Sequence, residues 1–507
     1  MGSTIGTMRI FDLGASRGQF VPGQTPSKSC GHAAAALSDV FALRFRPTIS
    51  TSSDGVVHVA ELSAFNSDRS SLKVMPLLLP LKLDDAEASP IREPLDKPNI
   101  VLLFVDDLGY GDLGFTGHPS TSTPALDRLA SDGKRLTSWY SGYPVCTSSR
   151  TALMTGRQPP RVGMPGVINS LSAAGLPLTE VTLADGLKAQ GYATLALGKW
   201  HLGQQPQYLP AARGFDAFLG LPFSVDDGEG IGDDSKCAKP GERSRKRGRA
   251  AGRSSTGGRS GTLGDALGPS LPLPLILQNR SANISKIVEQ PTDLRFLTAR
   301  MLNFSKAFIA DHRSQPFFVY FAFGHVHTAT PNVNPHTNPY NGKQYAGCDF
   351  LNTSRRGLFG DALQEVDGAV DQLLNPKTGW IKSQGLDRNT LTVFTSDNGP
   401  SIRWGLAAGS VGIFSGLSAS YQNGSHYRNT AKGSTWEGGI RMPAFAHFPG
   451  QIDAHTSSAE VVSTMDLLPS LLEIAGAKPI SGRAIDGKTS LAAIMLDNRY
   501  LHKDPCC

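Results

Sequence analysis

The chain has 507 residues, of which 39% are hydrophobic, and a formal net charge of +6 at pH 7. This length suits one large α/β domain with additional segments, and the apolar content is enough for a sizeable core. Six cysteines are too few for a disulfide-bonded scaffold and lack the spacing of a zinc site. No stretch reaches the ~20 apolar residues of a membrane span, and the mild charge excess does not indicate a nucleic-acid partner.

Residues 1–95 are rich in Ser, Gly and Pro and show little periodicity, which predicts a poorly ordered N-terminal extension. The first residues show no charged segment followed by an apolar run, so no signal peptide is recognisable. Asn-x-Ser/Thr sequons favour a secretory route instead, because three of the five fall close together. They start at Asn279, Asn283, Asn303, Asn352 and Asn423.

The periodic part of the chain begins at about residue 96. The apolar run Asn99–Val105 predicts a strand that is buried on both faces of a parallel sheet. A helix is predicted over Pro124–Asp132, with Thr123 as its N-cap and Gly133 at its C-terminal end.

Three further apolar runs predict strands over 192–197, 317–322 and 391–395. Helical patterns lie between them at 293–310 and 361–374. Strands that alternate with helices predict an α/β fold with a mainly parallel sheet.

Residues 226–270 interrupt this alternation with a basic, Gly- and Ser-rich segment that includes Arg243–Arg249. One interpretation is a nucleic-acid-binding or targeting patch. The other, which the composition favours, is a solvated low-complexity insertion without a nucleic-acid partner.

Each of the four predicted strands ends in polar residues. Ligands of open α/β sheets bind beyond the carboxyl ends of the strands, so these groups are expected in one crevice. The strand ends carry Asp106 and Asp107, Lys199 and His201, His325 and His327, and Asp397 and Asn398.

Two of these strand ends offer oxygen ligands, which select Ca²⁺ or Mg²⁺ over zinc. Either pair alone is better explained by helix capping or a turn, but the two pairs together favour a metal site. The oxygen ligands belong to Asp106, Asp107, Asp397 and Asn398.

The remaining groups are cationic or donate hydrogen bonds, as suits a tetrahedral oxyanion such as sulfate or phosphate. A solvated lysine and a satisfied core histidine are the structural alternatives. His325 and His327 point in opposite directions on an extended chain, so only one of them is expected to enter the site. The candidates are Arg150, Lys199, His201, His327 and Lys432.

Cys146 precedes the segment Ser149–Met154, which could open a helix. A thiol at a helix N-terminus beside Arg150 would have a lowered pKa and be a candidate nucleophile. From the residues alone, a buried structural cysteine is an equal alternative. The same structural interpretation is the expectation for Cys30 and Cys348.

Five segments of the chain resemble, in the same order, the motifs of the sulfatase family. They are Asp106–Gly114, Cys146–Arg157, Gly198–Gly203, Ser396–Gly399 and Lys432–Arg441. The resemblance covers about residues 97–490, and it is closest to the arylsulfatase A and galactosamine-6-sulfatase branch over 272–297 and 360–374.

The resemblance implies an alkaline-phosphatase-like core, with a large mixed, mainly parallel sheet flanked by helices, in a catalytic domain over 96–490. Family members continue into a smaller C-terminal sheet domain, for which residues 491–507 are expected to be a truncated remnant.

The resemblance also implies the reaction and its cofactors. A formylglycine-generating enzyme would oxidise Cys146 to formylglycine, whose hydrate attacks the sulfur of a small aryl or sugar sulfate ester. The protein would be lysosomal or secreted. Ca²⁺, with Mg²⁺ less favoured, would be held by Asp106, Asp107, Cys146, Asp397 and Asn398.

Each remaining site residue has an implied role. Asp397 would accept the nucleophile's proton, and His201 would accept the second proton. Arg150 and Lys199 would hold the hydrate. Sulfate would be bound by Lys199, His327 and Lys432.

Ser148 stands where the family pattern has proline. The modifying enzyme reads that proline, so we expect conversion of Cys146 to be reduced rather than abolished. Two other functions stay open: a phosphoesterase or phosphonate hydrolase of the same superfamily, and a catalytically inactive paralogue with a binding role. The sequence also leaves the oligomeric state open.

Overall fold

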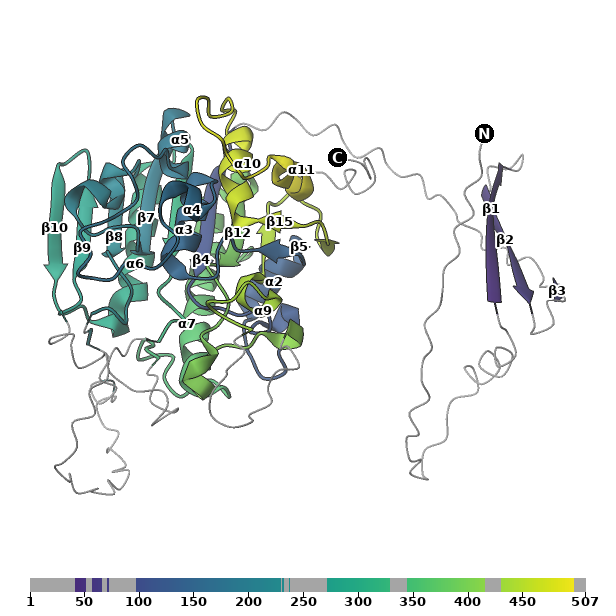
Figure 1. The fold of residues 1–507 in the computed structure, drawn as a ribbon, viewed down its shortest axis with the longest axis horizontal. Coiled ribbons are helices and arrows are strands. Elements are labelled where there is room, and N and C mark those ends of the chain that lie inside the picture. The colour runs from purple at the N-terminus through teal and green to yellow at the C-terminus, as the bar shows by residue number, and fades with distance from the viewer. Residues whose placement is uncertain are drawn as a thin grey trace, which may run out of the picture. The chain divides into compact units, whose positions relative to one another are not determined.

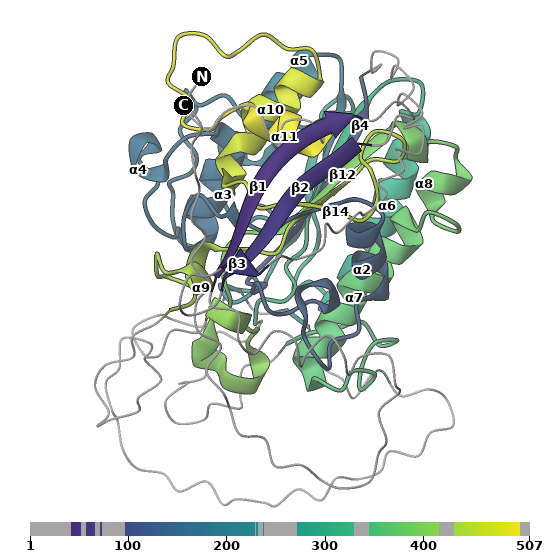
Figure 2. The ribbon, with the colours of Figure 1, turned by 90° about the vertical axis from the view of Figure 1, so that its right-hand side faces the viewer.

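The computed structural model describes residues 97–228, 230–231, 237, 271–328, 344–414 and 430–496, and the backbone of three strands nearer the N-terminus. The chain divides into two compact units, Met1–Glu93 and Pro94–Cys507. In the first unit, β1 (Ala42–Thr51), β2 (Val57–Phe65) and β3 (Ser71–Leu72) form an antiparallel sheet in that order (Figure 2). The rest of the predicted extension over 1–95 lies almost wholly outside the described residues.

A ten-stranded sheet forms the centre of the second unit, in the order β10-β9-β8-β7-β11-β4-β12-β13-β5-β14 (Figure 1). The bounds are β4 (Asn99–Val105), β5 (Lys134–Leu136), β7 (Ala193–Lys199), β8 (Ala217–Leu221), β9 (Leu275–Asn279), β10 (Ile284–Glu289), β11 (Phe317–Ala322), β12 (Thr390–Ser396), β13 (Phe445–His447) and β14 (Thr456–Ser458). A separate pair joins β6 (Trp139–Tyr140) to β15 (Val462–Ser463).

The five strands β8, β7, β11, β4 and β12 run parallel to one another, and antiparallel strands flank them on both sides. The sheet is therefore mixed and mainly parallel at its centre, which confirms the predicted fold class. Because parallel neighbours share a direction, their carboxyl ends meet at one edge of the sheet.

Helices cover both faces of this sheet (Figure 1). They are α2 (Pro124–Ser131), α3 (Cys146–Thr155), α4 (Pro159–Val162), α5 (Leu183–Ala189), α6 (Leu297–Asp311), α7 (Gly357–Leu374), α8 (Trp380–Ser383), α9 (Glu437–Ile440), α10 (Leu467–Ile474) and α11 (Ser490–Leu496). Short 3₁₀ helices lie at Gly114–Thr116, Pro206–Tyr208, Pro210–Ala212, Leu294–Phe296, Asp387–Asn389, Ile402–Ala407, Gly412–Phe414 and Thr464–Asp466.

Strand β4 sends its side chains alternately into two cores, as a strand buried on both faces must. Val101, Leu103 and Val105 pack with α2, α6 and α7 on one face. Ile100, Leu102 and Phe104 pack with α3, α5 and α10 on the other. The two helix layers exclude water from β4, so the polar residues that follow it project from a strand that is buried on both faces.

The predicted elements agree with the structure to within a few residues. β4 and β11 have the predicted bounds. β7 begins one residue later and ends two residues later than predicted, and β12 is one residue longer at each end. Helix α7 begins four residues before the predicted start, at Gly357. Helix α2 ends at Ser131 with Asp132 as its C-cap, so the predicted end was one residue late.

Cys348 was expected to be a buried hydrophobic residue, and this expectation is wrong. It forms a disulfide with Cys237, and the Cα atoms of the two residues are 5.2 Å apart. Most of the basic insertion 226–270 lies outside the described residues. None of the helices in the described part of the chain combines the length and the apolar character that crossing a membrane requires.

Candidate active site

The carboxyl ends of four parallel strands come together as predicted. The Asp106 backbone N–H donates to the His325 carbonyl at 2.7 Å, which ties the end of β4 to the end of β11. The Asp107 N–H donates to Asp397 Oδ1 at 3.1 Å, which ties β4 to β12. These bonds fix the backbone from which the site side chains project.

Asp106 lies at the centre of the site and is fully buried. Lys199 Nζ donates to its Oδ2 at 2.5 Å, and Arg150 Nη2 lies 3.7 Å from the same oxygen. Burial alone would raise the pKa of Asp106. The surrounding cations, Lys199 and His327 above all, outweigh burial and hold this pKa well below its usual range.

Asp107 has a left-handed backbone, with φ 59°, which turns its side chain back toward the strand ends. Its Oδ1 accepts hydrogen bonds from Asn398 Nδ2 and from Lys432 Nζ, both at 2.6 Å. Its Oδ2 lies 3.5 Å from His327 Nε2. Asp107 thus connects three segments that are distant in the sequence.

Cys146 is the first residue of α3 and is almost completely buried. Its Sγ accepts a hydrogen bond from Lys432 Nζ at 3.0 Å and lies 3.8 Å from Asp106 Oδ1. Burial would raise the pKa of this thiol, but Lys199 and Lys432 outweigh burial and lower it. The predicted helix N-terminus and the predicted cationic surroundings are therefore both present.

Arg150 lies one turn further along α3 and is also fully buried. Its Nη2 donates to Asp397 Oδ2 at 2.9 Å, and its Nη1 donates to the Lys199 carbonyl at 2.9 Å. Burial and the nearby charge of Asp106 nevertheless raise the pKa of Asp397 well above its ordinary value. Arg150 therefore fixes the position of a carboxyl group that holds a proton readily.

The two site histidines differ in charge: the His201 ring is neutral and the His327 ring is cationic. His201 Nε2 donates to the Ile168 carbonyl at 2.8 Å, and its buried Nδ1 has no partner among the described residues. Burial and Lys199 lower the pKa of His201 to about 3, so the ring is neutral. His327 is also buried, but Asp226 and Asp107 raise its pKa to about 10.

Of the two histidines after β11, His327 faces the cluster of Asp107 and Lys432, and His325 does not. His327 faces Asp107, whereas the His325 ring packs against Tyr345 at 4.3 Å and lies 3.3 Å from Glu365.

Three further polar residues, which the sequence interpretation missed, follow β8. Lys199 Nζ donates to Ser224 Oγ at 2.9 Å. Asp226 Oδ1 lies 3.8 Å from His327 Nδ1, and Asp227 Oδ2 lies 3.8 Å from His201 Nε2. The rule that ligands bind at strand ends applies to them too, but the short run Ala217–Leu221 was not identified as a strand.

A metal ion would find suitable ligands here. Ligand atoms of Asp106, Asp107, Cys146 and His327 all lie within 4.8 Å of one another. Asn398 Oδ1 is buried and has no hydrogen-bond partner among the described residues. Buried polar atoms normally have a partner, and a bound cation would provide one. Three of these five donor atoms are oxygens, from Asp106, Asp107 and Asn398, and oxygen ligands suit a hard divalent cation.

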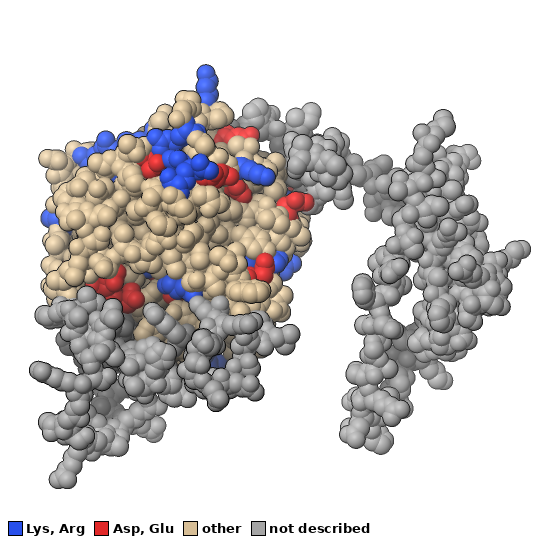
Figure 3. Space-filling model, in the orientation of Figure 1, with Lys and Arg blue, Asp and Glu red and all other residues tan. Residues whose placement is uncertain are grey.

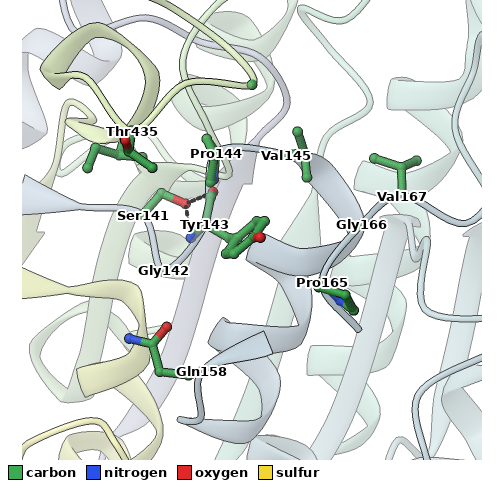
Figure 4. Close-up of a pocket in the computed structure, with 12 residues that line it drawn as sticks. Ser141, Gly142, Tyr143, Pro144, Val145, Gln158, Pro165, Gly166, Val167 and Thr435 are labelled. Carbon is green, nitrogen blue, oxygen red and sulfur yellow. Dashed lines mark hydrogen bonds between the residues drawn. The ribbon is translucent and has the colours of Figure 1, made fainter. Parts of the chain in front are cut away.

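A cavity of about 560 Å³ lies beside the N-terminus of α3 (Figure 4). Its walls include Tyr143 and Val145 just before Cys146, and Gly433 and Thr435 just after Lys432. Val167 closes another side, and none of the described residues that line the cavity is charged. The Gly433 N–H donates to the Pro144 carbonyl at 2.8 Å, which joins the two wall segments.

Residues 98–477 match the family model described as "Sulfatase". The chain belongs to the sulfatase family. Human arylsulfatase A is 40% identical to it over 395 residues, which cover 77% of this chain and 66% of that protein. Mouse steryl-sulfatase is 34% identical over 447 residues, covering 80% and 66%.

The match thus spans about two thirds of the length of these relatives. Among solved structures, the sulfatase PsFucS1 from Pseudoalteromonas sp. has a TM-score of 0.62 and 27% identity. That match covers 80% of this chain and 73% of the other. The fold and the family implied by the sequence motifs are confirmed.

Proposed function

We propose that this sulfatase-family chain hydrolyses sulfate esters of aryl alcohols or sugars, with residue 146 as the nucleophile after its conversion to formylglycine. The position of residue 146 carries the proposal. Its side chain lies at a helix N-terminus, 3.0 Å from the Lys432 ammonium and 3.8 Å from Asp106 Oδ1. Such a position combines cationic donors with a carboxylate, as an attack on an anionic ester requires.

The cationic residues around position 146 are proposed to bind the sulfate. In a water-excluded site, hydrogen bonds from charged donors to an oxyanion are stronger than in water. His327 is protonated, since its pKa is raised to about 10, so it can donate a proton toward the leaving oxygen. The proposed sulfate ligands are Lys199, His327 and Lys432.

Two residues are proposed to accept protons. The raised pKa of Asp397 suits it to take the proton of the attacking hydroxyl. His201 is neutral, and its Nδ1 has no partner among the described residues, so it is proposed to accept the second proton. Arg150 and Lys199 would hold the nucleophile in place.

Calcium is the proposed metal, with magnesium less favoured, and its proposed ligands are Asp106, Asp107, residue 146, Asp397 and Asn398. The unpaired Asn398 Oδ1 and the number of oxygen donors support this choice. When bound, the ion would reduce the electrostatic cost of bringing the nucleophile and the sulfate together. The uncharged cavity beside Val145 would accommodate the alcohol part of the ester.

The proposed modifying partner is a formylglycine-generating enzyme, and the proposed location is the lysosome or the outside of the cell. The Cys237–Cys348 disulfide supports this location, because such bonds persist in oxidising compartments.

The function is tested with the full chain produced through a secretory route together with a formylglycine-generating enzyme. The mass of the peptide that carries residue 146 is measured, and rates are compared on an aryl sulfate and an aryl phosphate, each with calcium, magnesium or a chelator. We expect the aryl sulfate to be hydrolysed faster than the aryl phosphate. We also expect its hydrolysis to be faster with calcium than with magnesium or the chelator. Cys146→Ala should reduce kcat by on the order of 10⁶, as loss of a nucleophile does.

Modified protein that turns over no aryl sulfate would refute the proposed activity. A faster reaction with the aryl phosphate would favour the phosphoesterase alternative. A thiol that stays unmodified in all molecules, together with an absence of hydrolysis, would favour the inactive paralogue.

A further inference from the structure

The backbone of Asp106 is held by one peptide group, the one between His325 and Val326. The Asp106 N–H donates to the His325 carbonyl at 2.7 Å, and the Val326 N–H donates to the Asp106 carbonyl at 2.8 Å. The next residue, His327, faces Asp107. The place of this peptide group therefore sets the positions of two residues of the proposed site, Asp106 and His327.

This peptide group lies outside the central sheet. β11 ends at Ala322, so residues 324–327 lie beyond its ladder with β4. Backbone outside regular structure opens more easily than a buried strand does. Two side chains from other parts of the chain, Glu365 and Gln344, support it.

Glu365 lies on α7 (Figure 1) and is only 3% exposed. Glutamates usually stay in contact with water, as do the acidic side chains that Figure 3 shows in red at the surface. A buried carboxyl group needs partners for its oxygens. Glu365 Oε2 accepts the Gly347 N–H at 2.5 Å and lies 3.3 Å from His325 Nε2.

His325 has its support from this carboxyl group and from one aromatic ring. The imidazole is fully buried, and neither of its nitrogens makes a hydrogen bond to the described residues. The Tyr345 ring packs against it, with the ring centroids 4.3 Å apart. Removing the Glu365 carboxyl group would take away the acidic neighbour of a buried imidazole, which is costly for a buried polar group.

Gln344 supports the other residue of the peptide group. Its Nε2 donates to the Val326 carbonyl at 2.5 Å and to the Ala407 carbonyl at 2.9 Å, and the side chain is buried. The segment 344–347 thus contacts Val326 through Gln344 and His325 through Tyr345. Glu365 joins the same segment to His325 a second time, through a single oxygen atom.

We propose that Glu365 is a positioning residue for sulfate ester hydrolysis: through His325 it holds the 325–326 peptide group against Asp106. The inference rests on the proposed function. The effect of Glu365 on the reaction passes through Asp106, a proposed metal ligand, and His327, the proposed proton donor. A displacement of reacting groups by about 1 Å can lower a rate by roughly 10²-fold.

Three variants of the full chain, produced together with a formylglycine-generating enzyme, test this role. Glu365→Ala removes both contacts of the carboxyl group. Glu365→Gln should keep both, because a glutamine oxygen in the place of Oε2 can make both. Leu373→Ala is the matched control, because Leu373 is buried in the same helix but lies about 12 Å further along its axis.

The kinetic measurement compares kcat and KM at saturating calcium for two aryl sulfates whose leaving groups differ in pKa. Glu365→Ala should lower kcat by about 10- to 100-fold, with a smaller change in KM. The loss should be larger for the poorer leaving group, because His327 is the proposed donor to the leaving oxygen. Glu365→Gln and Leu373→Ala should keep kcat close to that of the wild type. Wild-type kinetics in Glu365→Ala would overturn the proposal, and so would an equal loss in Leu373→Ala.

Amide hydrogen exchange gives a second measurement that needs no turnover. The two hydrogen bonds between Asp106 and the peptide group protect the amides of Asp106 and Val326. These amides should exchange at least several-fold faster in Glu365→Ala, and at the wild-type rate in Glu365→Gln and Leu373→Ala. Unchanged exchange in Glu365→Ala would overturn the proposal. A wild-type chain that is converted at residue 146 and hydrolyses no aryl sulfate would instead refute the proposed function, and the exchange rates would still decide whether Glu365 holds this peptide group.

Discussion

At the residue scale, the site is a buried network in which three carboxyl groups each have a lysine or arginine partner. Asp106 pairs with Lys199, Asp107 with Lys432, and Asp397 with Arg150. Removing one member of such a pair leaves an uncompensated buried charge, which typically costs about 3–5 kcal/mol. Burying these charged groups around residue 146 therefore lowers the free energy of unfolding, and it gives a cluster of charges from which water is excluded.

Ser148 is the residue in α3 that departs from the family pattern. It is fully buried, and its hydroxyl donates to the Met164 carbonyl at 2.8 Å and to the Gly166 carbonyl at 3.0 Å. It is the third residue of the helix, where the backbone N–H has no carbonyl of the same helix to bond. A proline there would lose the two hydroxyl bonds but no helical hydrogen bond.

We predict that Ser148→Pro increases the fraction of chains converted at residue 146, as measured by peptide mass spectrometry after co-expression with a formylglycine-generating enzyme. The Ser148 hydroxyl has one proton, which it shares between the two carbonyls, so the loss of this shared bond should lower the free energy of unfolding by about 0.5–1.5 kcal/mol. Ser148→Ala is the control, because it loses the same bonds without gaining the proline. Equal conversion in both variants would contradict the prediction.

At the scale of elements, helix α2 receives its N-terminal cap from α7. Thr123 is the N-cap residue, but its hydroxyl accepts the Gly114 N–H at 3.1 Å and donates to Asp127 at 3.1 Å, and it accepts no N–H of α2. Asp367 accepts hydrogen bonds from the N–H groups of Leu126 at 2.8 Å and Ala125 at 3.2 Å. The predicted N-cap residue is therefore confirmed, but the capping hydrogen bonds come from a carboxylate of a packed neighbour.

Burial raises the pKa of Asp367 to about 7, although its two backbone hydrogen bonds act in the opposite direction. In the unfolded chain an aspartate has a pKa near 3.9. Between these two values the folded protein binds more protons than the unfolded chain. The contribution of Asp367 to stability is therefore present below about pH 4 and is lost as the pH rises to about 7.

Asp367→Asn should remove this part of the pH dependence. The predicted difference in slope between wild type and variant is at most ~1.4 kcal/mol per pH unit, measured by denaturant unfolding between pH 4 and 7. Asp371→Asn in the same helix is the control, because its side chain is 46% exposed and lies 3.6 Å from Arg128. Parallel pH profiles for wild type and Asp367→Asn would disprove this assignment.

At the scale of the whole molecule, the Cys237–Cys348 disulfide joins residues 111 positions apart. Such a bond restricts the unfolded chain more than the folded one, and a loop of this size gives about 4.7 kcal/mol in the chain-entropy model. The disulfide connects the first part of the insertion to the segment just before α7.

We predict that Cys348→Ser lowers the free energy of unfolding by about 2–5 kcal/mol. A reducing agent should lower the melting temperature of the wild type in the same way and leave that of Cys348→Ser unchanged. Cys237→Ser should behave like Cys348→Ser. If reduction affected wild type and variant equally, the disulfide would not be the source of the stability.

The sequence by itself determined the central strands and the position of the site. Runs such as Asn99–Val105 and Phe317–Ala322 contain too many consecutive apolar residues for a strand with one wet face, so burial on both faces followed. Because parallel strands end at one edge, the polar residues after them had to meet. This is why the candidates at the strand ends, such as Asp106, Lys199 and Asp397, could be named before their distances were known, whereas Lys432 and the role of Cys146 followed from the resemblance to the family motifs.

Only the tertiary structure decided the contacts between residues that are distant along the chain. It placed His327 rather than His325 in the site, brought Asp226 and Asp227 to the two histidines, and paired Cys237 with Cys348. It also placed the Asp367 carboxylate at the N-terminus of α2, which lies more than 240 residues earlier in the sequence. The spacing of apolar residues indicates which face of a helix or strand is buried. The partners of the polar side chains depend instead on how separate helices and strands pack against one another.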